Sequence, residues 1–181
     1  MKKLLILLVV ISLLYFGTKV FLNKWYKVSE TFDMEDCKVY KAILDDLNDE
    51  EMGLAVFSRT ITTASDGQSV QHVVVQHFFE IIPSGEIFCV LDFLRKNKKI
   101  SLLKDCEFLG GPYQLIPQDF CSFYLRRGVK VIAPTRPGYD IKEQKALVYL
   151  EIFTRFENDR YIVLLTKRNG RWMVQNKIIV E

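Results

Sequence analysis

The sequence has few of the residues on which catalytic and metal sites depend. Only 2 of its 181 residues are histidine, and none of its 4 cysteines belongs to a Cys-x-x-Cys pair. Zinc sites and thioredoxin-like redox sites need such clusters, so the sequence supports neither. The Gly-x-Ser-x-Gly and His-Glu-x-x-His motifs, the phosphate-binding loop and the dinucleotide fingerprint are also missing. We therefore predict no catalytic residues, no metal and no cofactor, and we favour a protein that is not an enzyme.

The two histidines are poorly placed to share a metal ion. His72 and His77 fall in one predicted strand over residues 70–82. Side chains alternate between the two faces of a strand, and an odd spacing points these two imidazoles in opposite directions. A single strand cannot bring both to the same ion.

Acidic residues are absent before Glu30, whereas five of the 25 basic residues precede it. The remaining 20 basic residues stand against 22 acidic ones, which gives the rest of the chain a net charge of −2. A nucleic-acid-binding protein needs a clustered basic surface. We therefore expect no nucleic-acid partner, and we assign the N-terminal lysines to a membrane segment.

The N-terminus contains an apolar segment over residues 4–22, flanked by lysines. Its length is close to the ~20 residues that span a bilayer, and Trp25 would lie at the membrane interface. A cleaved signal peptide is the alternative, although Tyr15 and Phe16 stand where small residues normally precede cleavage. A soluble helix is the third reading of this segment. We favour an uncleaved anchor that contacts the membrane through residues 4–22.

These observations predict the domain organisation and the location. Residues 1–27 form a signal-anchor or transmembrane segment, and residues 28–181 form a single α+β domain. The short N-terminal tail favours a single-pass protein of the cell membrane whose body faces the periplasm or the cell exterior. The alternative is a secreted or periplasmic protein after signal cleavage.

The four cysteines allow two interpretations. In an oxidising compartment they can form one or two disulfides, and three full pairings are possible. Otherwise they are small buried apolar residues. The cysteines concerned are Cys37, Cys89, Cys106 and Cys121.

The body is predicted to belong to the α+β class. We expect an N-terminal transmembrane or signal helix, then an antiparallel sheet ending in a three-stranded C-terminal meander, packed by about three helices. Apolar residues at helical spacing predict the helices, and β-branched runs predict the strands. The expected helices cover residues 34–47, 86–96 and 117–127, and the expected strands cover 54–63, 70–82, 129–133, 146–153, 160–168 and 171–179.

The last two strands are joined by Asn169-Gly170, a strong signal for a two-residue type I′ turn. This turn fixes the pairing. The expected pairs are Arg168 with Arg171, Lys167 with Trp172, Leu165 with Val174, and Val163 with Asn176. One face is then the core side, and the other is at least half exposed. The predicted core side carries Tyr161, Val163, Leu165, Trp172, Val174 and Ile178.

The C-terminal part of the chain carries a resemblance. Its ordered segments are TRPGY at 135–139, ALVYL at 146–150, YIVLL at 161–165 and NGRWMV at 169–174. They resemble a group of uncharacterised bacterial exported or membrane-anchored proteins with the pattern Ser-Arg-x-Gly-Phe, Ala-Leu-Val-Tyr-Val, Tyr-Tyr-Val-Leu-Leu and Gly-Lys-Trp-x-Val. Thr135 replaces the serine of that pattern. The group commonly has a Cys-Gly pair in the loop before its second strand, and this chain has residues 156–159, Phe-Glu-Asn-Asp, there instead. The ending is also weakly similar to the nuclear-transport-factor-like cone fold.

Three arginines are the candidate ligand or partner contacts. Arg136 lies in a rigid corner between prolines, where a fixed guanidinium can bind a carboxylate or phosphate, or can pair with an acid of the fold. Arg168 and Arg171 form a like-charge pair at an exposed hairpin tip, where an acidic protein partner can dock.

Two functions follow from these features. We favour a non-enzymatic, membrane-tethered, extracytoplasmic interaction or ligand-binding domain. The alternative is a small hydrolase or isomerase with a cone-shaped pocket lined by Tyr and Asp.

Overall fold

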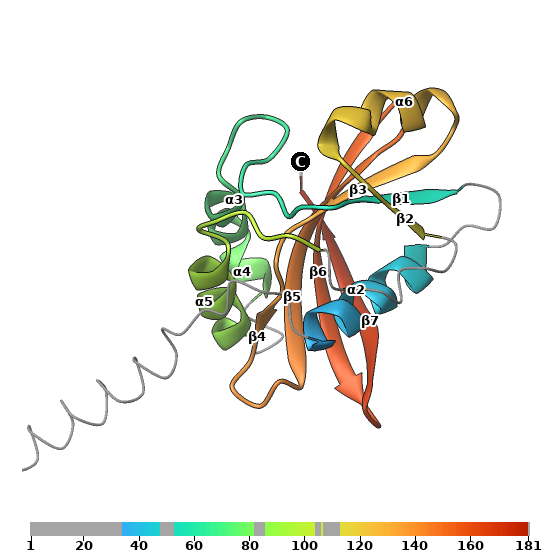
Figure 1. Ribbon diagram of the computed structural model, residues 1–181. Helices are drawn as coiled ribbons and strands as arrows, with labels where there is room; N and C mark the ends of the chain where they lie inside the picture. The colour runs from blue at the N-terminus through green and yellow to red at the C-terminus, as the bar shows by residue number, and fades with distance from the viewer. Residues whose placement is uncertain (1–33, 48–52, 82–85, 104–105, 107–112, 181) are drawn as a thin grey trace, which may run out of the picture. The chain divides into compact units, whose positions relative to one another are not determined.

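Figure 1 shows the computed structural model, which describes residues 34–47, 53–81, 86–103, 106 and 113–180. These residues belong to one compact unit, Thr31–Glu181. The predicted membrane segment, residues 4–22, lies outside the described residues. Among the helices that are described, none is both long and apolar enough to cross a membrane.

The central element is a seven-stranded sheet. Six strands follow the order β2-β1-β3-β5-β6-β7, and β4 pairs with β5. The strands are β1 (Leu54–Phe57), β2 (Tyr113–Ile116), β3 (Lys130–Pro134), β4 (Gly138–Tyr139), β5 (Lys145–Phe153), β6 (Asn158–Arg168) and β7 (Arg171–Ile179). The α+β class is confirmed, but the sheet is mixed, because β1 runs parallel to β2 and to β3. Parallel neighbours need crossover connections, and helices after β1 and after β2 provide them.

The C-terminal meander is confirmed, since β5, β6 and β7 pair antiparallel. Both central residues of the β6–β7 turn have positive φ, 50° at Asn169 and 76° at Gly170. Asparagine tolerates this conformation and glycine adopts it freely. The pairs confirmed next to the turn are Arg168 with Arg171, Lys167 with Trp172, and Leu165 with Val174.

A β-bulge after Leu164 changes the register further along the hairpin. Val163 pairs with Lys177, so the predicted pairing with Asn176 is wrong. One extra residue reverses the alternation of side chains in the rest of the strand. The prediction that Ile178 shares a face with the tryptophan of β7 is therefore wrong, and Ile178 packs with the helices on the opposite face.

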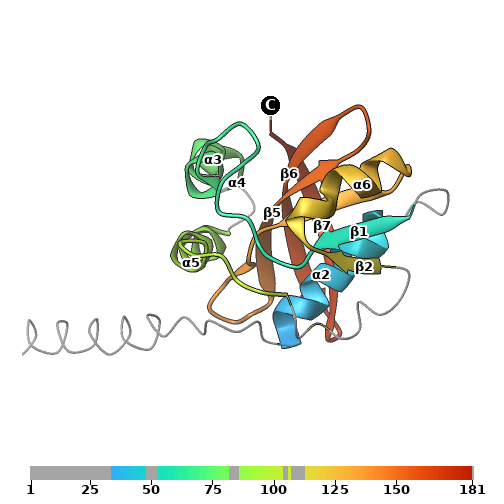
Figure 2. The same cartoon turned by 45° about the horizontal axis from the view of Figure 1, so that its top comes forward.

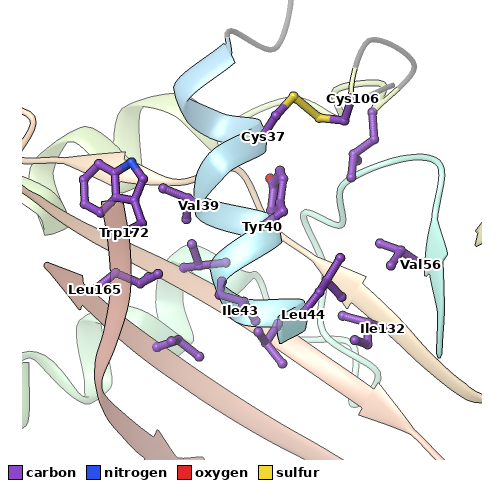
Figure 3. Close-up of a cluster of buried hydrophobic side chains, with 14 of the residues drawn as sticks. Cys37, Val39, Tyr40, Ile43, Leu44, Val56, Cys106, Ile132, Leu165 and Trp172 are labelled. Atoms are coloured by element: carbon purple, nitrogen blue, oxygen red, sulfur yellow. A yellow bond between two sulfur atoms is a disulfide. The ribbon is translucent and has the colours of Figure 1, made fainter. Parts of the chain in front are cut away.

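Helix α2 (Met34–Leu47) covers one face of the sheet and has the predicted bounds. Its apolar side chains recur every three or four residues and therefore share one side of the helix. Figure 3 shows Tyr40 and Leu44 of α2 on the side of Ile132, with Leu165 on the other side of the helix, all in one buried cluster. These contacts make the core on this face.

Four helices cover the centre of the opposite face of the sheet. They are α3 (Val70–Gln76), α4 (Phe78–Ile81), α5 (Ile87–Lys96) and α6 (Cys121–Arg126), the last following a 3-10 turn, η3 (Gln118–Phe120). Near the hairpin this face is exposed at Arg168 and Arg171, as predicted. Figure 2 shows α3, α4 and α5 grouped at one end of the sheet and α6 near β1.

The predicted strand over residues 70–82 is wrong, because α3 and α4 occupy this region. Val70, Val73 and Val74 recur at the helical period, and all three are buried. Their β-branched side chains favoured a strand, but burial of one helical face outweighed that preference.

One disulfide, Cys37–Cys106, joins α2 to the segment before β2 (Figure 3). Cys89 and Cys121 carry free thiols; Cys89 is buried, as the second interpretation predicts, whereas Cys121 is partly exposed. Burial raises the pKa of Cys89 to about 12, and burial also raises the pKa of Cys121. A raised pKa suppresses the thiolate, so neither thiol is an activated nucleophile.

Candidate functional site

The structure separates the three arginines that the sequence indicates. Arg136 is 2% exposed, whereas Arg168 and Arg171 are exposed at the tip of the β6–β7 hairpin. The tip arginines are together in one place, and Arg136 lies in the interior.

Arg136 occupies a corner of the chain between β3 and β4, both of which pair with β5. The backbone N–H and the hydroxyl of Thr135 donate to the carbonyl oxygen of Tyr149, at 2.9 and 2.7 Å. Asn97, at the end of α5, bonds to the N–H and the carbonyl of Arg136, each at 2.8 Å. A Cβ on Gly138 would overlap the backbone of α5, so this close approach requires glycine.

The Arg136 guanidinium pairs with a buried carboxylate on α2. Its Nε lies 3.2 Å from Oδ2 of Asp36, and the two side chains are 2% and 0% exposed. The Tyr139 hydroxyl donates to Oδ1 of Asp36 at 2.9 Å. A buried charge is tolerated only when it is paired and hydrogen-bonded. This pair therefore holds the corner against the first turn of α2.

Glu35, next in the chain to Asp36, connects α2 to the base of the hairpin tip. Its Oε2 accepts from Nζ of Lys167 at 2.7 Å and from Nε1 of Trp172 at 3.0 Å. Its Oε1 accepts from Nζ of Lys38 at 2.7 Å. Burial raises the pKa of Glu35, but the hydrogen bonds from these three donors together lower it to about 2. The carboxylate is therefore charged at neutral pH and holds two tip residues in place.

Replacing Glu35 with Gln should remove part of the pH dependence of stability. A carboxyl group whose pKa falls on folding contributes stability that is present above about pH 4.5 and is lost as the pH falls toward 2. We expect Glu35→Gln to be clearly less stable than the wild type at neutral pH and to approach it only at about pH 2. Urea unfolding at both pH values measures this, with the exposed Glu157→Gln as the control. An equal loss at both pH values would contradict the ion pairing.

The tip arginines border an open hollow of about 650 Å³. The described residues that line it are Arg168, Asn169, Arg171, Trp172 and Met173. Trp172 is only 7% exposed and is held by Glu35, whereas Met173 is 51% exposed. The hollow therefore combines apolar surface with two cations.

Arg168 and Arg171 lie directly opposite each other across the hairpin. Within the described part of the chain, neither guanidinium has an ion-pair partner. Like charges in directly opposed positions destabilise a sheet. Two exposed guanidiniums in opposed positions can bind a carboxylate or another acidic group.

A second buried carboxylate, Glu151, lies on β5 and is 1% exposed. It accepts hydrogen bonds from the Tyr149 hydroxyl at 2.7 Å and from the backbone N–H of Ser65 at 2.9 Å. Burial and the adjacent carboxylate raise the pKa of Tyr149 far above its usual range. The phenol therefore remains a hydrogen-bond donor inside the core.

The described residues contain no group of three His, Cys, Asp or Glu side chains that could hold a metal ion. His72 is exposed on α3, and Nδ1 of His77 lies 2.8 Å from a carboxylate oxygen of Glu80.

Sequence reasoning did not identify Asp36 as the partner of Arg136. A signal was present, because Asp36 shares the helical face of Tyr40 and Ile43. An acid within an apolar helical stripe indicates a buried partner. The contact of Glu35 with the hairpin has no comparable signal, because it depends on where β6 and β7 pass α2.

Comparison with known proteins gives no family assignment. The chain matches no protein-family model, no curated protein and no solved structure.

Proposed function

We propose that this chain is a non-enzymatic binding domain, tethered to a membrane by residues 4–22, that contacts an acidic protein partner through the β6–β7 tip. The proposal rests chiefly on Arg168 and Arg171, two exposed guanidiniums in directly opposed positions beside an open hollow. The body faces the periplasm or the cell exterior. Arg136 acts inside the fold, where it positions the elements beneath the site.

Contacts with α2 hold the base of the β6–β7 hairpin tip in place. Lys167 and Trp172 precede and follow the tip arginines, and both bond to Glu35. The Trp172 ring also packs against Tyr139, with 5.8 Å between ring centroids. Binding costs less conformational entropy when the contacting strands are already ordered. The strand residues next to the two arginines are therefore already ordered before a partner binds.

Reversing both tip charges should weaken binding of an acidic probe. We expect the full chain, in nanodiscs of zwitterionic lipid, to bind a fluorescent glutamate-rich peptide. Arg168→Glu/Arg171→Glu should weaken that binding at least about tenfold, because a hydrogen bond to a charged group contributes about 1.5–3 kcal/mol. Fluorescence anisotropy measures the affinity.

The chain offers a matched control for this experiment. Arg126 and Arg127 are also an exposed arginine pair, at the end of α6. Arg126→Glu/Arg127→Glu makes the same change in net charge away from the hairpin and should retain binding. If both double variants lose affinity equally, the attraction depends on net charge and the tip is not the site.

The Cys37–Cys106 disulfide supports an extracytoplasmic body, because disulfides persist in oxidising compartments. Full-length chain taken from cells, denatured and treated with a mass-tagged maleimide should therefore carry two labels, on Cys89 and Cys121. Prior reduction should raise the number to four, and four labels without reduction would contradict the proposed location.

The alternative, a small hydrolase or isomerase, needs a carboxylate and a tyrosine that face a substrate pocket. The pairs Tyr149–Glu151 and Tyr139–Asp36 have suitable groups, but all four side chains are buried. A substrate would have to open the core to reach them. The exposed arginines favour binding as the function.

A further inference from the structure

Helix α5 carries apolar side chains on two sides. Cys89, Val90 and Phe93 are buried on the side that faces the rest of the body. Ile87 and Leu91, one helical turn apart, are 42% and 45% exposed. A surface helix usually presents polar residues on its outer side. The second apolar side of α5 therefore indicates a contact beyond this domain.

Neighbouring helices extend this apolar region. Val75 on α3 is 48% exposed, and Phe79 on α4 is 83% exposed. The Gln71 side chain donates to the carbonyl of Leu94, which fixes α3 beside α5. Figure 2 shows α3, α4 and α5 together at one end of the sheet. A gathering of exposed apolar side chains is typical of a protein or membrane contact.

The end of α5 adds positive charge to this region. Asp92 pairs with Arg95 and Lys96, the two basic residues in the last turn of the helix, so its one negative charge offsets one of their two positive charges. Lys98 and Lys99 come next and are exposed, followed by Ile100, which is 59% exposed. Among the described residues of α3, α4 and α5, Glu80 is the exposed acidic side chain, and it pairs with His77. Lys98 therefore places positive charge beside the apolar side chains, and the Lys99 side chain is exposed next to it.

The length of the tether keeps the body close to a membrane. The chain between residue 22 and Met34, the first residue of α2, extends to about 40 Å at most. This reach is similar to the ~30 Å diameter of a small domain. A body on such a tether remains within contact distance of the lipid surface.

We propose that this region, here named the α4–α5 surface, rests on the anionic headgroups of the membrane that anchors the chain. Its residues are Val75, Phe79, Ile87, Leu91, Lys98 and Lys99. Apolar side chains gain by entering the headgroup boundary, and nearby lysines gain from anionic lipid. A second copy of the chain fits less well, because a symmetric contact brings the same lysines together. The inference depends on the proposed membrane tether and leaves the hairpin tip available to the partner.

A fluorescent reporter at position 79 tests this contact in the full chain. The cysteine content suits the experiment: one pair forms the disulfide, Cys89 is 0% exposed, and Cys121→Ser removes the partly exposed thiol. Phe79→Cys is then labelled with the polarity-sensitive dye NBD. The protein is placed in nanodiscs of phosphatidylcholine with or without phosphatidylglycerol. Phe156→Cys is the matched control, because Phe156 is 86% exposed and lies on the β5–β6 loop.

We expect NBD at position 79 to become several-fold brighter and to shift to the blue when phosphatidylglycerol is present, and NBD at position 156 to stay unchanged. Lys98→Glu/Lys99→Glu should remove the response at position 79. Equal signals in both lipids, or a response that survives the lysine reversal, would overturn the α4–α5 surface as a lipid contact. A response that depends on the number of chains in each disc would indicate a second copy and would also overturn it.

Failure of the tether gives a different result. If the chain does not co-elute with either kind of disc, the membrane tether is wrong and the lipid contact is wrong with it. Co-elution with no change in NBD emission overturns the lipid contact alone.

Discussion

Replacing Arg136 with Met is expected to lower the free energy of unfolding by about 3–5 kcal/mol, because it removes the charge that compensates a buried carboxylate. Asp36 is 0% exposed and its Oδ2 lies 3.2 Å from Nε of Arg136. The Tyr139 hydroxyl still donates to Asp36 in this variant, but a neutral donor does not balance a buried charge. Urea unfolding of the full chain in a mild non-ionic detergent, followed by far-UV circular dichroism, measures the change.

A double-mutant cycle with Asp36→Asn separates the charge from the packing. Asparagine keeps the size of Asp36 and can still accept from Tyr139, but it carries no charge. We expect Arg136→Met/Asp36→Asn to be about 1–3 kcal/mol more stable than Arg136→Met alone. If the two losses simply add, Arg136 stabilises the corner through packing, and the ion pair is not the cause.

Replacing Trp172 with Ala is expected to cost about 3–5 kcal/mol, the usual loss for a large aromatic side chain in a core. Trp172 is 7% exposed and packs with the side chains beneath α2 (Figure 3). The substitution also removes the hydrogen bond to Glu35, which spans 3.0 Å. The same unfolding measurement applies.

Met173 provides the control for this prediction. It is the next residue of β7 and is 51% exposed, so Met173→Ala should change stability by less than about 1 kcal/mol. A loss near zero for Trp172→Ala would mean that the two faces of the hairpin are exchanged.

Arg136 and Trp172 are linked to each other through α2. Asp36 and Glu35 are adjacent on α2: the first pairs with Arg136, and the second bonds to Trp172. The first turn of α2 therefore joins the corner before β4 to the base of the hairpin tip. We infer that interior stability and the position of the proposed binding surface depend on the same turn of helix.

The local signals of the sequence predicted the C-terminal meander and α2 correctly. The Asn169-Gly170 turn determines its own pairing, because few other residues accept positive φ at both positions. Helix α2 has a regular apolar stripe and acidic residues in its first turn. Both elements are specified by residues close together in the chain.

Other features depend on contacts between distant segments. The bulge that turns Ile178 to the other face contains no turn residue or glycine from which it could be predicted. The parallel pairing of β1 places residues 54–57 beside residues 113–116. The β-branched run around Val73 predicted a strand, but the residues form a helix, because their apolar side chains also recur at the helical period. These outcomes are set by tertiary packing.

The candidate site was predictable in part. The exposed pair of Arg168 and Arg171 follows directly from the turn and its register. Arg136 was placed correctly in a rigid corner, but its partner lies 100 residues earlier in the chain. Long-range pairing of this kind could not be derived from local spacing, although Asp36 stands within an apolar stripe.

A charge-swap measurement tests the central proposal, that the hairpin tip binds an acidic partner. The wild type and Arg168→Glu/Arg171→Glu are each titrated with a glutamate-rich and a lysine-rich peptide of equal length, in nanodiscs of zwitterionic lipid. We predict that the wild type prefers the glutamate-rich peptide and that the variant prefers the lysine-rich one, with Arg126→Glu/Arg127→Glu behaving as the wild type. The proposal is contradicted if the tip variant keeps the wild-type preference.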